Sequence, residues 1–179
     1  KIRAIRPIED FQKTQEQLLS EYMNISKDKA RRLIQDEIYE KWEATFKGIT
    51  PFPGVEDVLY YLKNRGIKLG VLSDFPVDKK LKYLNLPDVW DAKETSENTG
   101  YLKPNPEPFR YIADDLDTNP EHILYVGNNY EYDVVGARNC GMYTAYLGRE
   151  GEKGKFADIF FKTYGELKEK IIPFLSNAH

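Results

Sequence analysis

The spacing of apolar residues changes near residue 50. Before that point, apolar side chains recur at roughly helical spacing in two runs, with no strand pattern between them. The first run consists of Ile8, Phe11, Leu18, Leu19, Tyr22 and Met23, and the second of Ala30, Leu33, Ile34, Ile38, Tyr39 and Trp42. Ser26 precedes the second run and is the expected N-cap of its helix. The pattern predicts a small helical subdomain over residues 1–50, closed by the proline-rich turn Thr50–Gly54.

From Pro53 onward the pattern alternates between helices and strands. Helices are expected over residues 55–63, 79–84, 107–114 and 164–174, and from Asp133 onward. Strands are expected over residues 68–73, 89–92, 123–126, 142–147 and 158–161. Such alternation is typical of a parallel sheet with helices on both faces. We therefore expect an α/β fold with a parallel-sheet core over residues 51–179.

Composition narrows the classes of function. A chain of 179 residues, 41% of them hydrophobic, can bury one sizeable core. The net charge of −3 argues against a nucleic-acid surface, and no apolar run approaches the ~18 residues of a membrane span. Cys140 is the single cysteine, which precludes an internal disulfide and fits a reducing compartment. We expect a cytoplasmic protein that binds neither nucleic acid nor membrane.

Polar residues lie at or just beyond the ends of expected strands. They are Ser73 and Asp74, Lys103 in the segment Gly100–Pro106, and Asn128, Asn129 and Asp133 after Gly127. Parallel sheets bind ligands at the carboxyl ends of their strands. A hydroxyl, backbone N–H groups and a lysine can hold phosphate oxygens, and carboxylate or amide oxygens suit magnesium. Taken alone, Ser73 and Asp74 are as typical of a cap or turn as of a site. Lys103 alone is more typical of a solvated lysine, Asn128-Asn129 of a turn pair and Asp133 of a helix N-terminal acid, so the interpretation rests on their order.

Taken together, these motifs resemble the haloacid dehalogenase-like hydrolase superfamily. The resemblance runs from Pro53 to Met142 and rests on four segments. They are Pro53-Gly54-Val55, Leu69-Gly70-Val71-Leu72-Ser73-Asp74, Leu102-Lys103-Pro104-Asn105-Pro106-Glu107-Pro108-Phe109, and Val126-Gly127-Asn128-Asn129 through Asp133 to Gly141-Met142. The resemblance implies a Rossmann-like core, magnesium-dependent phosphoryl transfer through an aspartyl-phosphate, and a small helical cap that the two helices before Pro51 resemble.

By position in these motifs, the resemblance implies a role for each of five residues. Ser73, Asp74 and Lys103 are implied to bind the phosphoryl group, and Ser73 and Lys103 to take part in catalysis. Asn128 and Asp133 are implied to lie in the loop that binds the cofactor Mg2+. The implied partner is a small phosphorylated substrate.

The chain departs from the family pattern in two ways. No apolar strand followed by Asp-x-Asp precedes the helical segment, so the first strand of the core, which carries the nucleophile, is expected to be absent. Asp10 lies in a helical pattern and is not assigned as the nucleophile. Asn128 stands where the family usually carries a magnesium-binding aspartate, which should weaken metal binding. A missing central strand leaves two unpaired edges, so we expect a separate N-terminal segment or another chain to fill the gap.

The sequence is compatible with two functions. The first is a magnesium-dependent phosphatase of a small metabolite, whose nucleophilic aspartate lies outside this chain, so that the chain alone is inactive. The second is a non-catalytic relative that keeps the fold as a binding or regulatory module, which Asn128 and the missing nucleophile favour. A haloacid dehalogenase is a lesser option, because the lysine and the metal-loop context favour phosphate.

Overall fold

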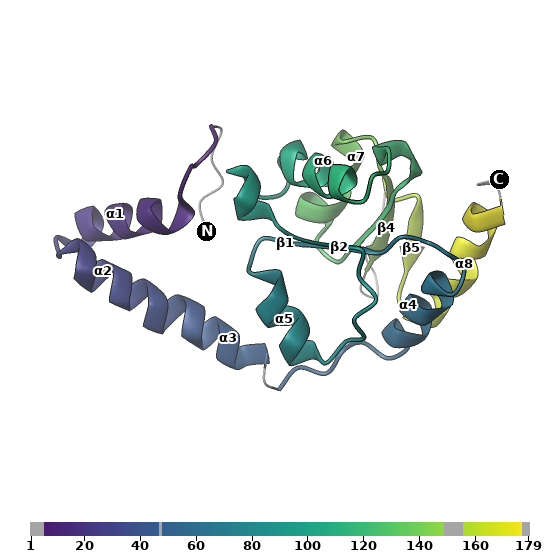
Figure 1. Ribbon diagram of the computed structural model, residues 1–179, viewed down its shortest axis with the longest axis horizontal. Helices are drawn as coiled ribbons and strands as arrows, with labels where there is room; N and C mark the ends of the chain where they lie inside the picture. The colour runs from purple at the N-terminus through teal and green to yellow at the C-terminus, as the bar shows by residue number, and fades with distance from the viewer. Residues whose placement is uncertain (1–5, 47, 149–155, 177–179) are drawn as a thin grey trace.

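The computed structural model describes residues 6–46, 48–148 and 156–176 (Figure 1). Before Pro51 the described elements are all helical: α1 (Phe11–Met23), α2 (Lys27–Ile34), the π-helix η1 (Gln35–Glu40) and α3 (Lys41–Phe46). Ser26 caps α2 by accepting a hydrogen bond from the Lys29 N–H, as expected. Asp10 caps α1 in an extended conformation and accepts from the Lys13 N–H at 2.9 Å. The expectation that Asp10 lies within a helix is therefore wrong.

The helices α1 and α2 pack against each other as a hairpin (Figure 1). Phe11, Ala30 and Ile34 are their buried apolar side chains. Glu16 is only 4% exposed, and its carboxylate accepts hydrogen bonds from the Arg31 guanidinium at 2.9 and 3.1 Å. Because a buried carboxylate needs such a partner, this pair fixes how α1 lies against α2. Together α1, α2, η1 and α3 form a helical arm over residues 11–46, and its last helix, α3, lies beside the helix α5.

The described strands form two parallel sheets. They are β1 (Gly70–Ser73), β2 (Ala92–Thr95), β3 (Leu124–Gly127), β4 (Tyr143–Leu147) and β5 (Ile159–Phe161). β1 pairs with β2, and β4 lies between β3 and β5, with every ladder parallel. The predicted α/β class with parallel strands is confirmed.

Helices cover both faces of these strands (Figure 1). The helical elements after residue 50 are α4 (Val55–Lys63), α5 (Val77–Leu84), η2 (Ser96–Thr99), α6 (Pro106–Asp115), η3 (Pro120–His122), η4 (Tyr130–Val135), α7 (Gly136–Asn139) and α8 (Tyr164–Ser176). Phe109 of α6 and Ala137 of α7 belong to one buried apolar cluster, and Val58 of α4 and Leu167 of α8 to another. None of the described helices combines the length and the apolar composition needed to cross a membrane.

The strand expected over residues 89–92 is misplaced, because β2 begins only at Ala92. The Asp91 carboxylate accepts a hydrogen bond from the Leu69 N–H at 2.8 Å and from the Lys63 ammonium at 2.6 Å. These long-range contacts hold the chain in a turn just before the strand. Apolar periodicity could not reveal them, because their partners lie more than twenty positions away.

The helix expected from Asp133 begins earlier, at Tyr130, as the π-helix η4. Asn129 caps it by accepting a hydrogen bond from the Tyr132 N–H at 2.9 Å. The earlier start places Asp133 inside the helical segment, with its side chain buried.

Among the described residues, β1 and β3 are not paired with each other. No residue of β3 is fully buried, and Val126 is 41% exposed, although the inner strands of parallel sheets are normally covered on both sides. Leu72 and Ser73 of β1 line the same cavity as Tyr125 and Val126 of β3. The two strands therefore flank this cavity with open edges.

Candidate functional site

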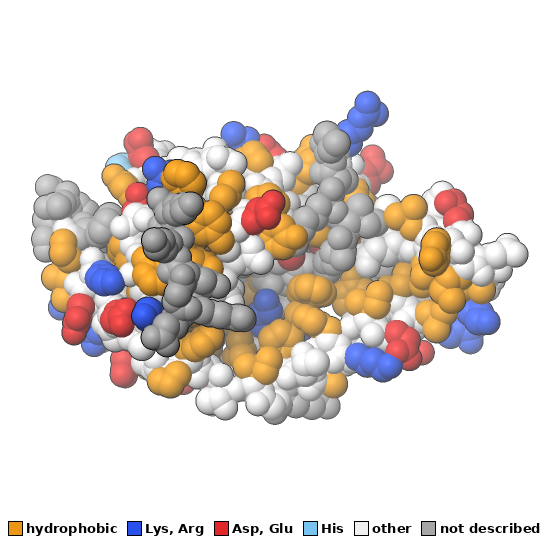
Figure 2. All heavy atoms as spheres, turned by 180° about the vertical axis from the view of Figure 1, so that it is seen from behind, with side chains coloured by type: hydrophobic (Ala, Val, Ile, Leu, Met, Phe, Trp, Pro, Cys, Tyr) orange, Lys and Arg blue, Asp and Glu red, His pale blue; other side chains and the backbone are white. Residues whose placement is uncertain are grey.

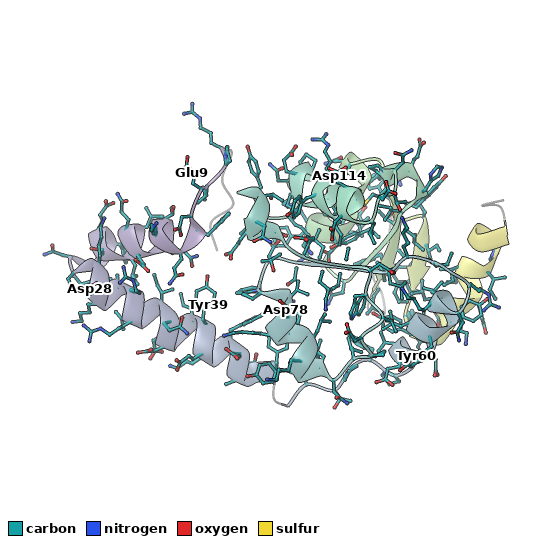
Figure 3. The ribbon with its side chains drawn as sticks, viewed as in Figure 1. Glu9, Asp28, Tyr39, Tyr60, Asp78 and Asp114 are labelled. Carbon is teal, nitrogen blue, oxygen red and sulfur yellow. The ribbon has the colours of Figure 1, made fainter. Side chains whose placement is uncertain are left out.

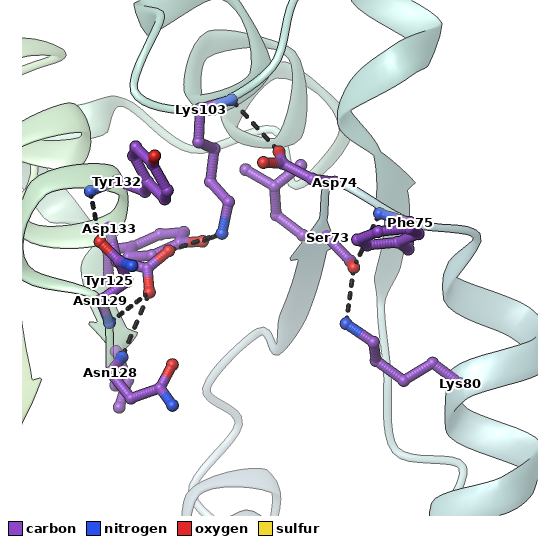
Figure 4. Close-up of a pocket in the computed structure, with 12 residues that line it drawn as sticks. Ser73, Asp74, Phe75, Lys80, Lys103, Tyr125, Asn128, Asn129, Tyr132 and Asp133 are labelled. Atoms are coloured by element: carbon purple, nitrogen blue, oxygen red, sulfur yellow. Dashed lines mark hydrogen bonds and ion pairs between the residues drawn. The ribbon is translucent and has the colours of Figure 1, made fainter. Parts of the chain in front are cut away.

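A cavity of about 320 Å³ lies at the carboxyl ends of β1 and β3 (Figure 4). It is lined by all five residues to which the sequence gives a role: Ser73, Asp74, Lys103, Asn128 and Asp133. Ser73 ends β1 and Asp74 begins the loop that follows it, while Lys103 precedes α6. Asn128 lies in the turn after β3, and Asp133 lies in the π-helix η4 that follows this turn. Groups that the sequence connects only by their order are therefore neighbours in space.

Lys103 is buried in the wall of this cavity, with its side chain 12% exposed. Its ammonium donates to Oδ1 of Asp133 at 2.5 Å and to the hydroxyl of Tyr125 at 3.1 Å. Burial alone lowers the pKa of the Lys103 ammonium, but the charges and hydrogen bonds of Tyr125 and Asp133 outweigh it and raise that pKa. Burial also raises the pKa of Tyr125 to about 12. Lys103 is therefore a fixed positive charge at neutral pH, with the phenol uncharged.

The Asp133 carboxylate connects this lysine to the turn after β3. Its Oδ2 accepts hydrogen bonds from the backbone N–H of Asn128 at 3.2 Å and of Asn129 at 3.0 Å. With Lys103 on Oδ1, both carboxylate oxygens have protein partners, and the side chain is 8% exposed. Asp133 thus organises the turn and orients the lysine, while the Asn128 residue stays exposed on the cavity wall.

Gly127 is the position where this arrangement has least tolerance for a side chain. A Cβ there would lie 2.3 Å from Cβ of Asp133 and 2.6 Å from its Oδ2. We expect Gly127→Ala to lower the free energy of unfolding by about 1–3 kcal/mol, because Asp133 or the strand must shift. Urea denaturation measures the change. Gly48→Ala is the control, since its Cβ would meet nothing within 4 Å; equal losses in the two variants would contradict the prediction.

Ser73 presents its hydroxyl on the other strand of the cavity. The residue is 5% exposed, and Oγ accepts hydrogen bonds from the Phe75 N–H at 3.1 Å and from the Lys80 ammonium at 2.7 Å. The neighbouring Asp74 accepts from the backbone N–H of Lys103 at 3.2 Å, which joins the β1 loop to the lysine loop. The site is thus held together by hydrogen bonds that cross between three separate segments.

Two residues of the site, Tyr125 and Lys80, were not predicted. Tyr125 belongs to the apolar run of β3, where its ring packs edge-on against Phe109 at 4.9 Å, so the sequence indicates only a packing residue. Lys80 lies on α5 among other charged residues and has no spacing signal toward Ser73. The sequence signal that could have identified Tyr125 as a site residue is its position near the carboxyl end of an expected strand.

Oxygen atoms of the kind that magnesium prefers line the same cavity, on Asp74, Asn128 and Asp133. Within the described ranges, no three His, Cys, Asp or Glu side chains come together as a metal cluster. Magnesium commonly keeps several waters and uses only one or two protein carboxylates. The donor set therefore fits part of a hydrated magnesium site.

Comparisons with known proteins show which proteins this chain is similar to. A sequence model of the family described as "Haloacid dehalogenase-like hydrolase" matches residues 6–147. The chain is 29% identical over 133 residues to the pyrophosphatase PpaX of Bacillus cereus, covering 73% of this chain and 54% of that protein. It is 33% identical over 108 residues to the glyceraldehyde 3-phosphate phosphatase of Methanothermobacter thermautotrophicus, covering 59% and 48%. The chain thus spans about half the length of these curated relatives.

A solved structure, the HAD phosphatase from Thermococcus onnurineus, resembles the fold with a TM-score of 0.66. The two chains are 26% identical, and the match covers 90% of this chain and 88% of the other. The likeness extends beyond the α/β core into the helices before residue 50, because the alignment takes in nearly the whole chain.

Proposed function

The chain belongs to the haloacid dehalogenase-like hydrolase family, and on that basis we propose that it forms the cap and most of the core of a phosphatase. Its substrate in this proposal is a small phosphorylated metabolite. The observation that carries the proposal is the cavity that is lined by both Ser73 and the charged Lys103. Relatives named as a pyrophosphatase and as a glyceraldehyde 3-phosphate phosphatase support phosphoryl chemistry.

Each site residue has a defined task in this proposal. The Ser73 hydroxyl and the Lys103 ammonium bind phosphoryl oxygens. The Asp74 carboxylate positions the lysine loop by accepting a hydrogen bond from the backbone N–H of Lys103. An aspartate from a strand outside the described residues attacks phosphorus, while a second acid protonates the leaving oxygen as its bond to phosphorus breaks. Water then cleaves the aspartyl-phosphate and releases inorganic phosphate. Donors already in place before charge develops favour both steps.

The open edges of β1 and β3 support the part of the proposal that concerns the nucleophile. Unpaired N–H and C=O groups at two neighbouring strands are costly unless another strand covers them. One added parallel strand would pair with both edges and place its carboxyl end beside Ser73 and Lys103. We assign this place to a strand bearing Asp-x-Asp, from a separate N-terminal segment or from another chain.

Magnesium is the cofactor we propose for this site. Asn128 would hold the ion through its amide oxygen, and Asp133 would act through water or by fixing the turn, since both its oxygens already accept hydrogen bonds. When bound, the ion neutralises charge on the phosphoryl oxygens. An amide supplies no negative charge, so the incoming strand must supply the carboxylate.

We propose that residues 1–50 form the cap and residues 51–179 the core. The arm contacts the core where α3 lies against α5, close to the cavity. A cap at this place could exclude water and shape the choice of substrate. Figure 3 shows Tyr39 on this arm, where its hydroxyl accepts a hydrogen bond from the Gln15 amide at 3.4 Å.

No nucleic-acid or membrane partner belongs to this proposal. Acidic and basic side chains are scattered among apolar ones over the face drawn in Figure 2, and the net charge of the chain is −3. A nucleic-acid surface would gather basic side chains along one face. A small anionic substrate needs only the local charges of the cavity.

Hydrolysis of p-nitrophenyl phosphate tests the proposal. We expect this chain alone to show no turnover, and the same chain carrying an N-terminal Asp-x-Asp strand to show turnover that depends on magnesium. Removal of magnesium with EDTA should abolish the activity, and added magnesium should restore it. A strand-bearing protein that folds but hydrolyses no phosphate ester would contradict the proposal.

A second candidate is a non-catalytic protein that binds phosphate through the same residues. The exposed amide of Asn128, in the family's usual place for a carboxylate, favours it. Phosphate binding without turnover by the strand-bearing protein would decide for this alternative. Turnover that rises after Asn128→Asp, with tighter magnesium binding, would decide for the phosphatase.

A further inference from the structure

Lys80 is a second lysine of the cavity, separate from the one that the sequence singles out. It lies on α5, and its ammonium donates to Oγ of Ser73 at 2.7 Å (Figure 4). Lys103 is bound instead to Asp133 and Tyr125. The two lysines therefore reach the cavity from different elements and hold different partners.

The hydrogen bonds of Ser73 determine which way its proton points. A hydroxyl has two acceptor lone pairs and one hydrogen to donate. Oγ already accepts from the Phe75 N–H and from the Lys80 ammonium, so both lone pairs are engaged. The O–H of Ser73 therefore points away from Phe75 and Lys80 and can donate to a third group. The positive charge of the Lys80 ammonium polarises this O–H and strengthens it as a donor. An oxygen of an anion in the cavity is a suitable acceptor for it.

Two aromatic rings of the helical arm lie close to the Lys80 ammonium. The ammonium lies 5.9 Å from the ring centre of Trp42 and 5.8 Å from that of Phe46, both on α3. Trp42 also stacks on Phe75, with ring centres 4.3 Å apart and an interplanar angle of 17°. Cation–π contacts at such distances are attractive. The position of Lys80 thus depends on where α3 lies.

A second contact fastens α3 to α5 beside these rings. The Glu43 carboxylate accepts hydrogen bonds from the Lys79 ammonium at 2.9 Å and from the Tyr83 hydroxyl at 2.7 Å. Glu43 is next to Trp42 on α3, and both of its partners are on α5. The arm therefore holds the helix that carries Lys80 at two adjoining places.

We propose that Lys80 is a positioning residue that turns the Ser73 hydroxyl toward a bound phosphoryl group and adds a positive charge to its site. The α3 aromatic pair holds Lys80 in place, so docking of the arm sets the anion affinity of the core. This inference rests on the proposed phosphatase function and deepens it. It assigns to the arm a direct effect on phosphate binding, in addition to covering the substrate.

Titration of this chain with inorganic phosphate, followed by NMR, tests the inference without turnover. We expect Lys80→Met to raise the Kd for phosphate about tenfold, as one charge-assisted hydrogen bond is lost. Lys80→Arg should restore most of the affinity. Lys82→Met is the matched control, because Lys82 is exposed on the same helix and does not line the cavity.

A double-mutant cycle separates positioning from a general effect of charge. In a Ser73→Ala background, Lys80→Met should weaken binding much less than in the wild type, because the hydroxyl it orients is gone. Trp42→Leu should raise the Kd about threefold through the lost cation–π contact. Unchanged binding by Lys80→Met, or an equal loss in Lys82→Met, would overturn the role of Lys80. Failure of the phosphatase proposal appears instead in the hydrolysis assay of the strand-bearing protein.

Discussion

Replacing Lys103 with methionine is expected to lower the free energy of unfolding by about 3–5 kcal/mol. The variant keeps most of the side-chain volume but removes the cation from Asp133, which is 8% exposed on its side chain. Removing one partner of a buried pair is costly because the other charge stays buried without compensation. The two backbone N–H groups on Oδ2 would remain as partners of the carboxylate. Urea denaturation followed by circular dichroism measures the loss.

Two variants test the cause of that loss. In Lys103→Met/Asp133→Asn no buried charge is left, so most of the lost stability should return. Lys93→Met is the exposed control: its ion pair with Asp88 is 3.4 Å long and largely solvated, and should be worth at most about 1 kcal/mol. A Lys103→Met loss no larger than that of Lys93→Met would show that the buried pair contributes little.

The pH dependence of this effect has a definite sign. The pKa of Lys103 is raised in the folded protein, so its contribution is complete below the unfolded value of about 10.4 and is lost as pH rises through the folded pKa. The difference in stability between wild type and Lys103→Met should therefore be constant from pH 6 to 9, within about 1 kcal/mol. It should shrink only above about pH 10. A difference that falls steeply near pH 7 would contradict the charged state assigned to Lys103.

The largest effect on activity is expected from the same lysine. In the strand-bearing protein, Lys103→Met/Asp133→Asn should lower kcat/KM by about 10²–10³-fold or more, since a preorganised donor to the phosphoryl oxygens is lost together with the Asp133 carboxylate of the proposed magnesium site. The double variant is expected to keep its fold, so the loss measures the chemistry of this pair and not unfolding. Initial rates with p-nitrophenyl phosphate, with magnesium present, give the value.

Two further measurements make that prediction specific. Lys93→Met in the same background should retain wild-type kcat/KM, because Lys93 lies outside the cavity. Ser73→Ala should also lower kcat/KM, through one lost hydrogen bond to the phosphoryl group. If the folded double variant retains the wild-type kcat/KM, Lys103 has no part in the proposed mechanism.

The helices and strands that were predicted correctly are those in which apolar residues of the sequence pattern are also buried in the structure. The apolar spacing before residue 50 predicted the helices of the arm, and Phe11, Ala30 and Ile34 are buried there. Other members of the same two runs are exposed instead: Leu18, Tyr22, Met23 and Ile38. β2 was misplaced, because its start is decided by the contacts of Asp91 with Leu69 and Lys63. Periodicity reports which side chains are apolar, and it carries no information on hydrogen bonds between distant segments.

In the candidate site, too, some residues could be predicted from the sequence, whereas other contacts required the structure. Ser73, Lys103 and Asp133 were found because their residue types follow strands or mark a motif, which can be read along the chain. The contact of Lys80 with Ser73 depends on how α5 packs after β1. The stack of Trp42 on Phe75 depends on where the arm meets the core. Neither contact can be predicted from the spacing of apolar and polar residues along the chain.

The sequence alone determined the class of fold, the order of the motifs and the residues expected to bind phosphate. It could do so because alternation of apolar residues and turn residues at strand ends are local properties. Only the tertiary structure decided that Asp133 is held by Lys103 and by backbone N–H groups. It also decided that β1 and β3 flank a cavity with edges that no strand among the described residues covers. Those features arise from packing between segments far apart in the chain, where the energy of a buried charge or an unpaired strand edge depends on which groups meet.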